Sequence, residues 1–245
     1  MSEKVIEISS LKKSFNGKYV LRGVSFHLNK KENIVILGKS GEGKSILLKS
    51  LVGLIHPEEG HINVLGEDIL KMRESKLIRF RRKIGYLFQE AALYDSMTVG
   101  ENITFALKRL SPQLKKKELL KITLHALEQV SLNDVIDKMP DELSGGMKKR
   151  VALARTLVLE PEIILYDEPT TGLDPQTSRE ISRLILEMRD RLNISALIVT
   201  HDMTCAEMTS DRLLILNEGK IAAEGKFSEL KNSEHMWIRR FFDEE

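Results

Sequence analysis

The sequence predicts an α/β fold in which crossover helices connect the strands of a parallel sheet. Three features of the 245 residues indicate this class: strand, glycine-rich loop and helix follow one another near residue 40, strands alternate with a helix in the final third, and a helical stretch lies between these parts. Strands joined through helices in this way run parallel. Neither a fixed-period repeat nor a linker divides the chain, so we expect one domain, residues 1–245, with a helical insert.

The expected strands of the first third are short apolar runs bounded by turn residues. They cover residues 5–8, 20–28, 34–37 and 62–65. A helix is expected to begin after Gly43, because the apolar residues that follow have the spacing of a buried helix: Ile46, Leu47, Leu48, Leu51 and Leu54. The chain therefore presents a strand, a glycine loop and a helix in succession.

The middle of the chain, from about residue 90 to residue 159, has the apolar spacing of helices. We therefore place a helical subdomain at about residues 90–157, inserted into a core of about residues 1–89 and 158–245. The final third returns to strands at residues 163–166, 196–200 and 213–216. The inner face of the helix between the first two is expected to be Ile181, Leu184, Ile185, Met188 and Leu192.

Bulk composition excludes several classes of protein. Hydrophobic residues make up 42% and charged residues 30% of the chain, which is ordinary for a globular protein. We find no run of 18 apolar residues that would span a membrane and no secretory signal. The only cysteine, Cys205, cannot form an internal disulfide, so it is expected to be a packing residue in a reducing, cytosolic compartment.

Charge gives no indication of a nucleic-acid partner. The 38 basic and 36 acidic side chains leave a net charge of only +2. Short basic runs occur at residues 79–83, 115–117 and 148–150. Runs of this length are usually solvated helix faces, and we expect that here.

Residues 38–45, Gly-Lys-Ser-Gly-Glu-Gly-Lys-Ser, match the pattern of a phosphate-binding loop. Backbone N–H groups of such a loop and of the following helix surround phosphates, and Lys44 adds a positive charge at the β and γ groups. Ser45 is expected to ligate Mg²⁺. The alternative, an ordinary glycine turn before a helix, is disfavoured by the apolar strand in front and the helix behind. The loop residues assigned to nucleotide binding are Gly38, Ser40, Gly41, Gly43, Lys44 and Ser45.

Two adjacent acids, Asp167 and Glu168, follow a buried strand. Ligands of open α/β sheets bind at the carboxyl ends of the strands. Asp167 is therefore expected to hold Mg²⁺ through water, and Glu168 to orient and deprotonate an attacking water. A solvated strand end is the alternative, but adjacent acids beside a phosphate loop favour catalysis.

A Leu-Ser-Gly-Gly-Met segment at residues 143–147 precedes another helix. Alone it would be a helix cap. With the phosphate loop before it and the Asp-Glu pair after it, the order resembles the ATP-binding cassette (ABC) ATPases over essentially the whole chain. In that family the serine and glycines, here Ser144, Gly145 and Gly146, form a signature motif. It offers a helix N-terminus to the γ-phosphate of ATP held by another protomer.

The resemblance implies a P-loop NTPase (RecA-like) core, an antiparallel β subdomain and an inserted helical signature subdomain. It also implies ATP and Mg²⁺ as cofactors and ATP hydrolysis coupled to transmembrane transport. The expected active form is a homodimer with two ATP molecules between head-to-tail copies. The resemblance also implies a cytoplasmic localisation, with the protein peripheral on the inner face of the cell membrane.

The resemblance assigns further residues to the site. Phe15 and Val20 belong to the nucleotide site, with Phe15 where the family has an aromatic residue that stacks on adenine; a core phenylalanine is the alternative. Gln89 matches the glutamine that senses Mg²⁺ and water. Asp174, in Gly-Leu-Asp-Pro, matches the loop that contacts the second subunit, and His201 matches the switch histidine near the γ-phosphate. Taken singly, Gln89 would be a solvated strand end, Asp174 part of a turn and His201 a structural histidine.

A narrower resemblance is to the ATPases of Mla-type lipid transporters, which work with MCE-domain lipid-binding proteins. It rests on Met147, which replaces the commoner glutamine, and on residues 88–99. An integral membrane permease is then expected to dock at residues 89–99. Alternatives are transport of amino acids, ions or export cargo, a soluble ABC protein of translation or DNA repair, and a regulatory cassette that binds ATP without splitting it.

Overall fold

Two sheets lie at the centre of the molecule, one antiparallel and one mostly parallel. The computed structural model describes residues 3–243, so the ends of the predicted domain 1–245 lie outside the described residues. The antiparallel sheet has the order β2-β1-β4-β5, made by Lys18–Asn29, Lys4–Phe15, Glu59–Val64 and Glu67–Asp68. The larger sheet has the order β10-β9-β3-β8-β7-β6, made by Lys220–Gly225, Arg212–Asn217, Asn33–Leu37, Ser195–Thr200, Ile163–Asp167 and Ile84–Leu87.

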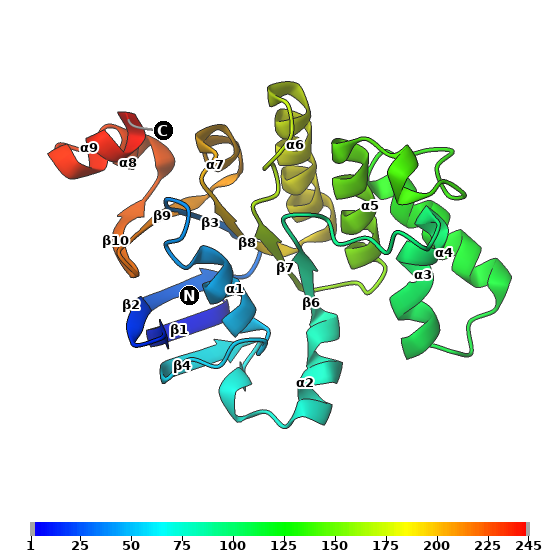
Figure 1. Cartoon of the computed structure of the whole chain (residues 1–245), viewed down its shortest axis with the longest axis horizontal. Helices are drawn as coiled ribbons and strands as arrows, with labels where there is room; N and C mark the ends of the chain where they lie inside the picture. Colours follow the sequence, from blue (N-terminus) through cyan, green and yellow to red (C-terminus); the bar gives the residue numbers. More distant parts are fainter. Residues whose placement is uncertain (1–2, 244–245) are drawn as a thin grey trace.

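Helices cover the sheets and extend beyond both ends of the larger sheet. Figure 1 shows α3, α4 and α5 together beyond β6, while α8 and α9 lie at the opposite end beyond β10. The bounds of the helices are Lys44–Leu51 for α1, Glu74–Phe80 for α2, Val99–Leu110 for α3, Lys116–Gln129 for α4, Gly145–Leu157 for α5, Pro175–Leu192 for α6, Met203–Thr209 for α7, Phe227–Lys231 for α8 and Met236–Asp243 for α9. The predicted α/β class, with an antiparallel β part and a helical insert, is confirmed.

The strands of the larger sheet are apolar throughout because both of their faces are covered. Along β3, Val35 and Leu37 pack with helices α3 to α7, whereas Ile34 and Ile36 pack with α1 and the antiparallel sheet. Residues in β7 and β8 alternate in the same way. Two hydrophobic cores on opposite faces therefore fix the carboxyl ends of β3, β6, β7 and β8 side by side.

The alternation of strands and helices predicted a wholly parallel sheet, and the structure corrects this prediction at one edge. Strand β10 pairs antiparallel with β9 through a tight hairpin. Its turn residues, Glu218 and Gly219, have φ of 47° and 75°, which is the conformation that two-residue hairpins require. A Glu-Gly pair is a weaker hairpin signal than Asn-Gly, so the sequence does not predict this strand.

The region from residue 90 to residue 159 is less helical than predicted. A short segment, residues 111–115, separates α3 from α4, a mostly irregular segment, residues 130–144, separates α4 from α5, and residues 90–98 form a loop. The buried side chain of Asn102 holds that loop, because its amide donates to the carbonyls of Tyr94, Met97 and Thr98 and its oxygen accepts from the Tyr94 amide. Side-chain bonds to the backbone here replace helical bonds.

One apolar expectation near the first helix and the expectation for the basic run at residues 148–150 need correction. Leu54 lies beyond the end of α1 and is 55% exposed, so it does not belong to the buried helix face. The basic runs are not all solvated, since Lys149 is only 5% exposed.

Cys205 is buried, and burial raises the pKa of its thiol to about 11, which confirms a packing residue. Among residues 3–243, no helix combines the length and apolar character needed to cross a membrane.

Candidate active site

The glycine loop between β3 and α1 fits tightly between the two sheets. Gly41 and Gly43 have φ of 85° and 96°, values that residues with a side chain rarely adopt. A Cβ on Gly43 would lie 2.7 Å from Val20 Cγ1 in β2, and one on Gly38 would lie 2.8 Å from the Leu216 carbonyl oxygen. The loop therefore needs glycine at these positions, and it leads directly into the N-terminus of α1, whose first amides have no partner within the helix.

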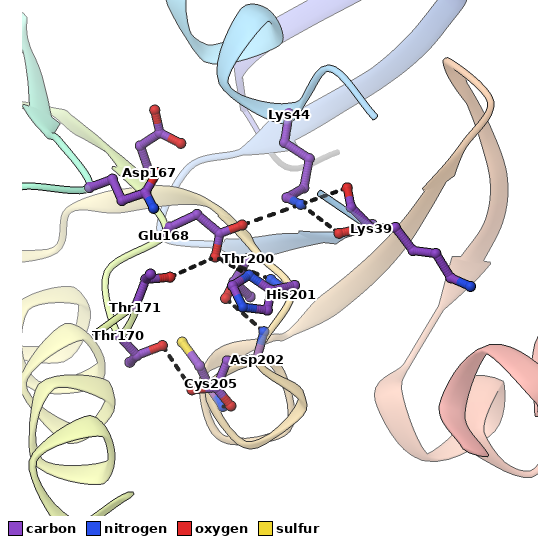
Figure 2. Close-up of polar contacts among 12 residues, drawn as sticks. Lys39, Lys44, Asp167, Glu168, Thr170, Thr171, Thr200, His201, Asp202 and Cys205 are labelled. Atoms are coloured by element: carbon purple, nitrogen blue, oxygen red, sulfur yellow. Dashed lines mark hydrogen bonds and ion pairs between the residues drawn. The ribbon is translucent and has the colours of Figure 1, made fainter. Parts of the chain in front are cut away.

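Lys44, the first residue of α1, points back across this loop. Its Nζ donates to the carbonyl oxygens of Gly38 and Lys39 and lies 3.2 Å from Glu168 Oε1 (Figure 2). Both side chains of the ion pair are more than nine-tenths buried. A buried ammonium ion at the mouth of a glycine loop attracts phosphate strongly, because little water screens its charge.

Glu168, directly after β7, is held by three donors on one oxygen. Oε2 accepts from the His201 backbone N at 3.2 Å, from His201 Nδ1 at 2.8 Å and from Thr171 Oγ1 at 3.3 Å (Figure 2). A carboxylate accepts only, so Nδ1 of His201 carries the proton. Glu168 is 7% exposed, whereas the His201 side chain is 48% exposed. The histidine therefore connects a buried carboxylate with the open side of the site.

Asp167, the last residue of β7, lies between α1 and β6. Its Oδ1 accepts from Ser45 Oγ at 2.7 Å, and its Oδ2 accepts from the Tyr86 hydroxyl at 2.9 Å. Burial, with Asp167 as the second cause, raises the pKa of the Tyr86 phenol, which therefore stays a donor at neutral pH. The aspartate is thus oriented from both sides.

The donors beside the phosphate loop fit Mg²⁺. The Ser45 hydroxyl and the Asp167 carboxylate are hard oxygen ligands of the kind that Mg²⁺ prefers, and they are already in contact. Within residues 3–243 no cluster of three or more acids, histidines or cysteines forms a metal cage. Mg²⁺ does not need one in a phosphate site, since it keeps several waters and takes phosphate oxygens.

One cavity of about 210 Å³ joins most of the predicted catalytic and phosphate-binding residues. Gln89 reaches it from the turn after β6, which ends at Leu87. Four segments distant in sequence thus meet at the carboxyl edge of the parallel strands. The residues lining the cavity are Ser40, Gly41, Gly43, Lys44, Ser45, Ile46, Gln89, Glu168 and His201.

The signature residues and Asp174 lie outside that cavity, at the N-termini of α5 and α6. Ser144 caps α5 by accepting from the Met147 amide at 3.3 Å. A Cβ on Gly146 would lie 2.5 Å from Thr177 Cγ2, so only glycine lets the two helices approach this closely. Asp174 caps α6, and hydrogen bonds led by the Thr177 hydroxyl lower its pKa.

Phe15 and Val20 lie in the antiparallel sheet, on either side of the β1–β2 turn. Phe15, at the end of β1, is 45% exposed and lies under Lys13, whose Nζ is 5.2 Å from the ring centroid. The alternative reading as a core phenylalanine is therefore wrong. Val20 is half-buried against the phosphate loop at Gly43. Stacking of Phe15 on adenine stays a prediction.

Three residues of the site were missed by the sequence analysis. Tyr86 donates to Asp167, Thr171 donates to Glu168, and the Lys149 ammonium donates to the backbone carbonyls of Gln89 and Glu168. Tyr86 lies on the strand that leads to Gln89, three residues before it, and this position is the sequence signal that could have assigned Tyr86 to the site. Lys149 was hidden in a basic run, where nothing in the sequence distinguishes a buried lysine from a solvated one.

A glycine loop entering a helix from a buried strand, with an Asp-Glu pair on the next strand but one, defines a P-loop nucleoside triphosphatase. Residues 21–171 match the family model described as ABC transporter. The chain belongs to this family: it is the ATP-binding subunit of an ABC transporter and an ATPase.

The chain is similar to its relatives over nearly all of its length. It is 39% identical to the protein Trigalactosyldiacylglycerol 3 of Arabidopsis thaliana over 98% of this chain and 74% of that protein. It is 38% identical to the probable ribonucleotide transport ATP-binding protein mkl of Mycobacterium leprae over 97% of this chain and 68% of that protein. A dimeric ATP-binding cassette in a post-hydrolysis state, bound to ADP and Pi, has a TM-score of 0.84 at 30% identity, covering 91% of this chain and 98% of that one.

Proposed function

We propose that this ATPase hydrolyses Mg²⁺-ATP with Glu168 as general base and drives the movement of lipid by a membrane permease. The observation that carries the catalytic part is the contact of the buried Glu168 carboxylate with both Lys44 and His201. Lys44 is the phosphate-binding lysine, so a carboxylate 3.2 Å from it stands beside the expected γ-phosphate.

Each residue then has a distinct task in hydrolysis. Glu168 orients the attacking water and accepts its proton, while His201 and Thr171 hold the carboxylate in place. Lys44 and the loop amides balance the charge of the phosphates. Ser45 and Asp167 would hold Mg²⁺, with Gln89 close to the same place, and the bound ion would supply neutralisation of the phosphate charge.

The complete site is proposed to need two copies of the chain. Ser144, Gly145 and Gly146 do not line the cavity of their own chain, yet they form a helix N-terminus suited to a phosphate. Head-to-tail pairing would bring them against the Lys44 site of the second copy, with Asp174 at the same interface. The solved dimeric cassette, bound to ADP and Pi, supports a dimer as the working form. Binding of ATP would close the pair and hydrolysis would open it.

A groove beside the active site supports permease docking at residues 89–99. It has a volume of about 450 Å³ and is lined by Tyr86, Phe88, Tyr94 and Arg155, among others. Tyr94 is 46% exposed and packs on Phe105 with ring centroids 4.9 Å apart. Arg155 on α5 donates to the carbonyls of Ala91 and Ala92 and so fixes the loop. Exposed aromatic side chains over a rigid groove are typical of docking surfaces.

We expect a cysteine at position 94 or 97 to cross-link to a co-expressed permease. Tyr94 lines the groove and Met97 follows three residues later in the loop held by Asn102, so a partner helix seated there is expected within reach of both positions. The background needs no change, because Cys205 is buried. Cross-linked products are measured by gel shift and mass spectrometry.

Leu124→Cys is the matched control, since Leu124 is 51% exposed on α4 away from the groove. Cross-links from position 124 with none from 94 or 97 would place the permease elsewhere on the cassette.

Lipid is proposed as the substrate class. It is supported by the relative whose name is that of a glycolipid and by Met147 in the signature. A second relative is named for ribonucleotide transport, so the substrate has to be tested directly. An MCE-type lipid-binding protein is proposed as a third component. The subunit itself would stay on the cytoplasmic face of the membrane, held there by the permease.

Mass spectrometry of the purified transporter complex should find bound phospholipid or glycolipid. Because lipids are poorly soluble, a lipid pathway retains its substrate through purification, whereas a solute pathway does not. ATPase activity should also rise when lipid is supplied in nanodiscs. Stimulation by ribonucleotides or another solute, without bound lipid, would contradict the lipid assignment and leave the ATPase assignment intact.

A further inference from the structure

Lys149, in the second turn of α5, is a buried lysine inside the ATPase. Lys149 is 5% exposed, whereas its neighbours Lys148 and Arg150 are half-buried. Arg150 is engaged elsewhere, with the Val130 carbonyl and with Glu180. Burial of an ammonium ion is costly unless it makes hydrogen bonds, so the contacts of Lys149 need an explanation.

The ammonium group bonds backbone at two different loops. Nζ donates a short hydrogen bond to the Gln89 carbonyl and a longer one, of 3.4 Å, to the Glu168 carbonyl. Gln89 follows β6 and Glu168 follows β7, which are neighbouring parallel strands. One side chain on the signature helix therefore bridges the two loops that carry the proposed glutamine and the proposed base.

The backbone at Glu168 is strained and depends on such contacts. Its φ is 50°, in the left-handed region that residues with a side chain seldom adopt. Its N–H donates to the Val199 carbonyl in β8 at 2.9 Å, and its C=O accepts from Lys149. The peptide units on both sides of the Glu168 side chain are thus fixed, one by the sheet and one by the lysine.

The charges around Lys149 suit an ammonium ion at this place. Burial lowers its pKa, and the nearby carboxylates of Glu168, Asp167 and Glu90 oppose that shift. An apolar side chain of equal length would leave the Gln89 carbonyl without this donor. The geometry alone gives Lys149 a role in orientation, since its Nζ reaches only main-chain oxygens among the contacts described.

We propose that Lys149 is a positioning residue that links the signature helix to the loops of Gln89 and Glu168. Ser144 and Lys149 are five residues apart on one rigid helix, or about 7.5 Å along its axis. When the N-terminus of α5 takes up a phosphate, the movement of the helix is passed through Lys149 to both loops. This inference rests on the proposed roles of Glu168 and of the signature residues.

The test is Lys149→Met, with Lys149→Arg as rescue and Lys148→Met as matched control, in the purified full-length chain. Methionine keeps the apolar stem and removes every donor, so kcat for ATP should fall by about 10- to 100-fold, as expected for a misplaced catalytic group. The KM for ATP should stay within about threefold, because the phosphate loop is untouched. Arginine keeps a positive charge and offers N–H donors to both carbonyls, so it should restore most of kcat, and Lys148→Met should behave as wild type.

A purely structural role gives a different pattern. It predicts a lower Tm and a parallel loss of ATP binding and kcat as the folded fraction falls. Thermal melting and nucleotide titration separate the two readings. If Lys149→Met does not fold, Lys149→Gln, which keeps a polar side chain with one donor group, carries the same comparison of kcat with KM.

A double variant shows whether Lys149 acts through Glu168. In a Glu168→Gln background, single-turnover hydrolysis should fall by less than about threefold on adding Lys149→Met, because the base is already absent. An equal loss in both backgrounds would overturn the proposal. Wild-type turnover in Glu168→Gln itself would instead refute the proposed base. Slow turnover there, with wild-type kcat in Lys149→Met, would refute only the role of Lys149.

Discussion

Glu168→Gln should hydrolyse ATP about 10²- to 10⁴-fold more slowly than wild type while still binding it, since the substitution removes a general base and preserves its shape. The amide oxygen can still accept from His201 and Thr171, so the loop after β7 should keep its geometry. The variant should accumulate as a closed ATP-bound dimer, because the γ-phosphate remains as the bridge between Lys44 of one copy and Ser144 of the other. ATPase rate and nucleotide titration, with the permease present, measure both effects.

An intersubunit cross-link separates catalysis from dimer closure. Cysteines at Ser40 and Met147 should react across the closed interface when ATP is added to Glu168→Gln. Glu162→Gln is the control, because Glu162 lies just before the same strand in an exposed ion pair with Lys83 and should not affect turnover. Wild-type turnover in Glu168→Gln would exclude it as the base. Slow turnover without ATP-dependent cross-linking would support the base and refute the sandwich.

The phosphate loop and the acidic pair were readable from the sequence because their chemistry is local. A glycine loop, a lysine and a serine occupy eight consecutive residues, and the order of strand, loop and helix is fixed by apolar periodicity. Asp167 and Glu168 follow a run of four buried residues, so their place at the edge of the sheet follows from the same pattern. Ser45 and Asp167 are 122 residues apart, yet both were assigned to the metal.

The missed features depend on contacts between segments that no local pattern encodes. Whether Lys149 is solvated or buried depends on how α5 packs against the turns after β6 and β7. The loop at residues 90–98 is ordered by Asn102 on α3, whose role appears only when the fold is known. Strand β10 is exposed on alternate residues and has few large apolar side chains, and its pairing depends on a Glu-Gly turn. Tertiary context decides each case.

Lys44→Ala should reduce ATP affinity by about 10²-fold or more, as expected when a buried charge that contacts phosphate is deleted. The loop amides alone leave much of the triphosphate charge uncompensated. Affinity is measured by nucleotide titration in the presence of Mg²⁺. Lys39→Ala, an exposed lysine of the same loop, is the matched control and should change affinity far less.

The same substitution should also destabilise the protein, by about 3 to 5 kcal/mol, because it leaves the buried Glu168 carboxylate without its cation. That effect must be separated from the loss of phosphate binding. Adding Glu168→Gln to Lys44→Ala removes the uncompensated charge, so the double variant should recover much of the Tm while its ATP affinity stays low. Recovery of both quantities would mean that Lys44 acts on ATP only through the stability of the fold. Unchanged affinity in Lys44→Ala would remove the lysine from the phosphate site altogether.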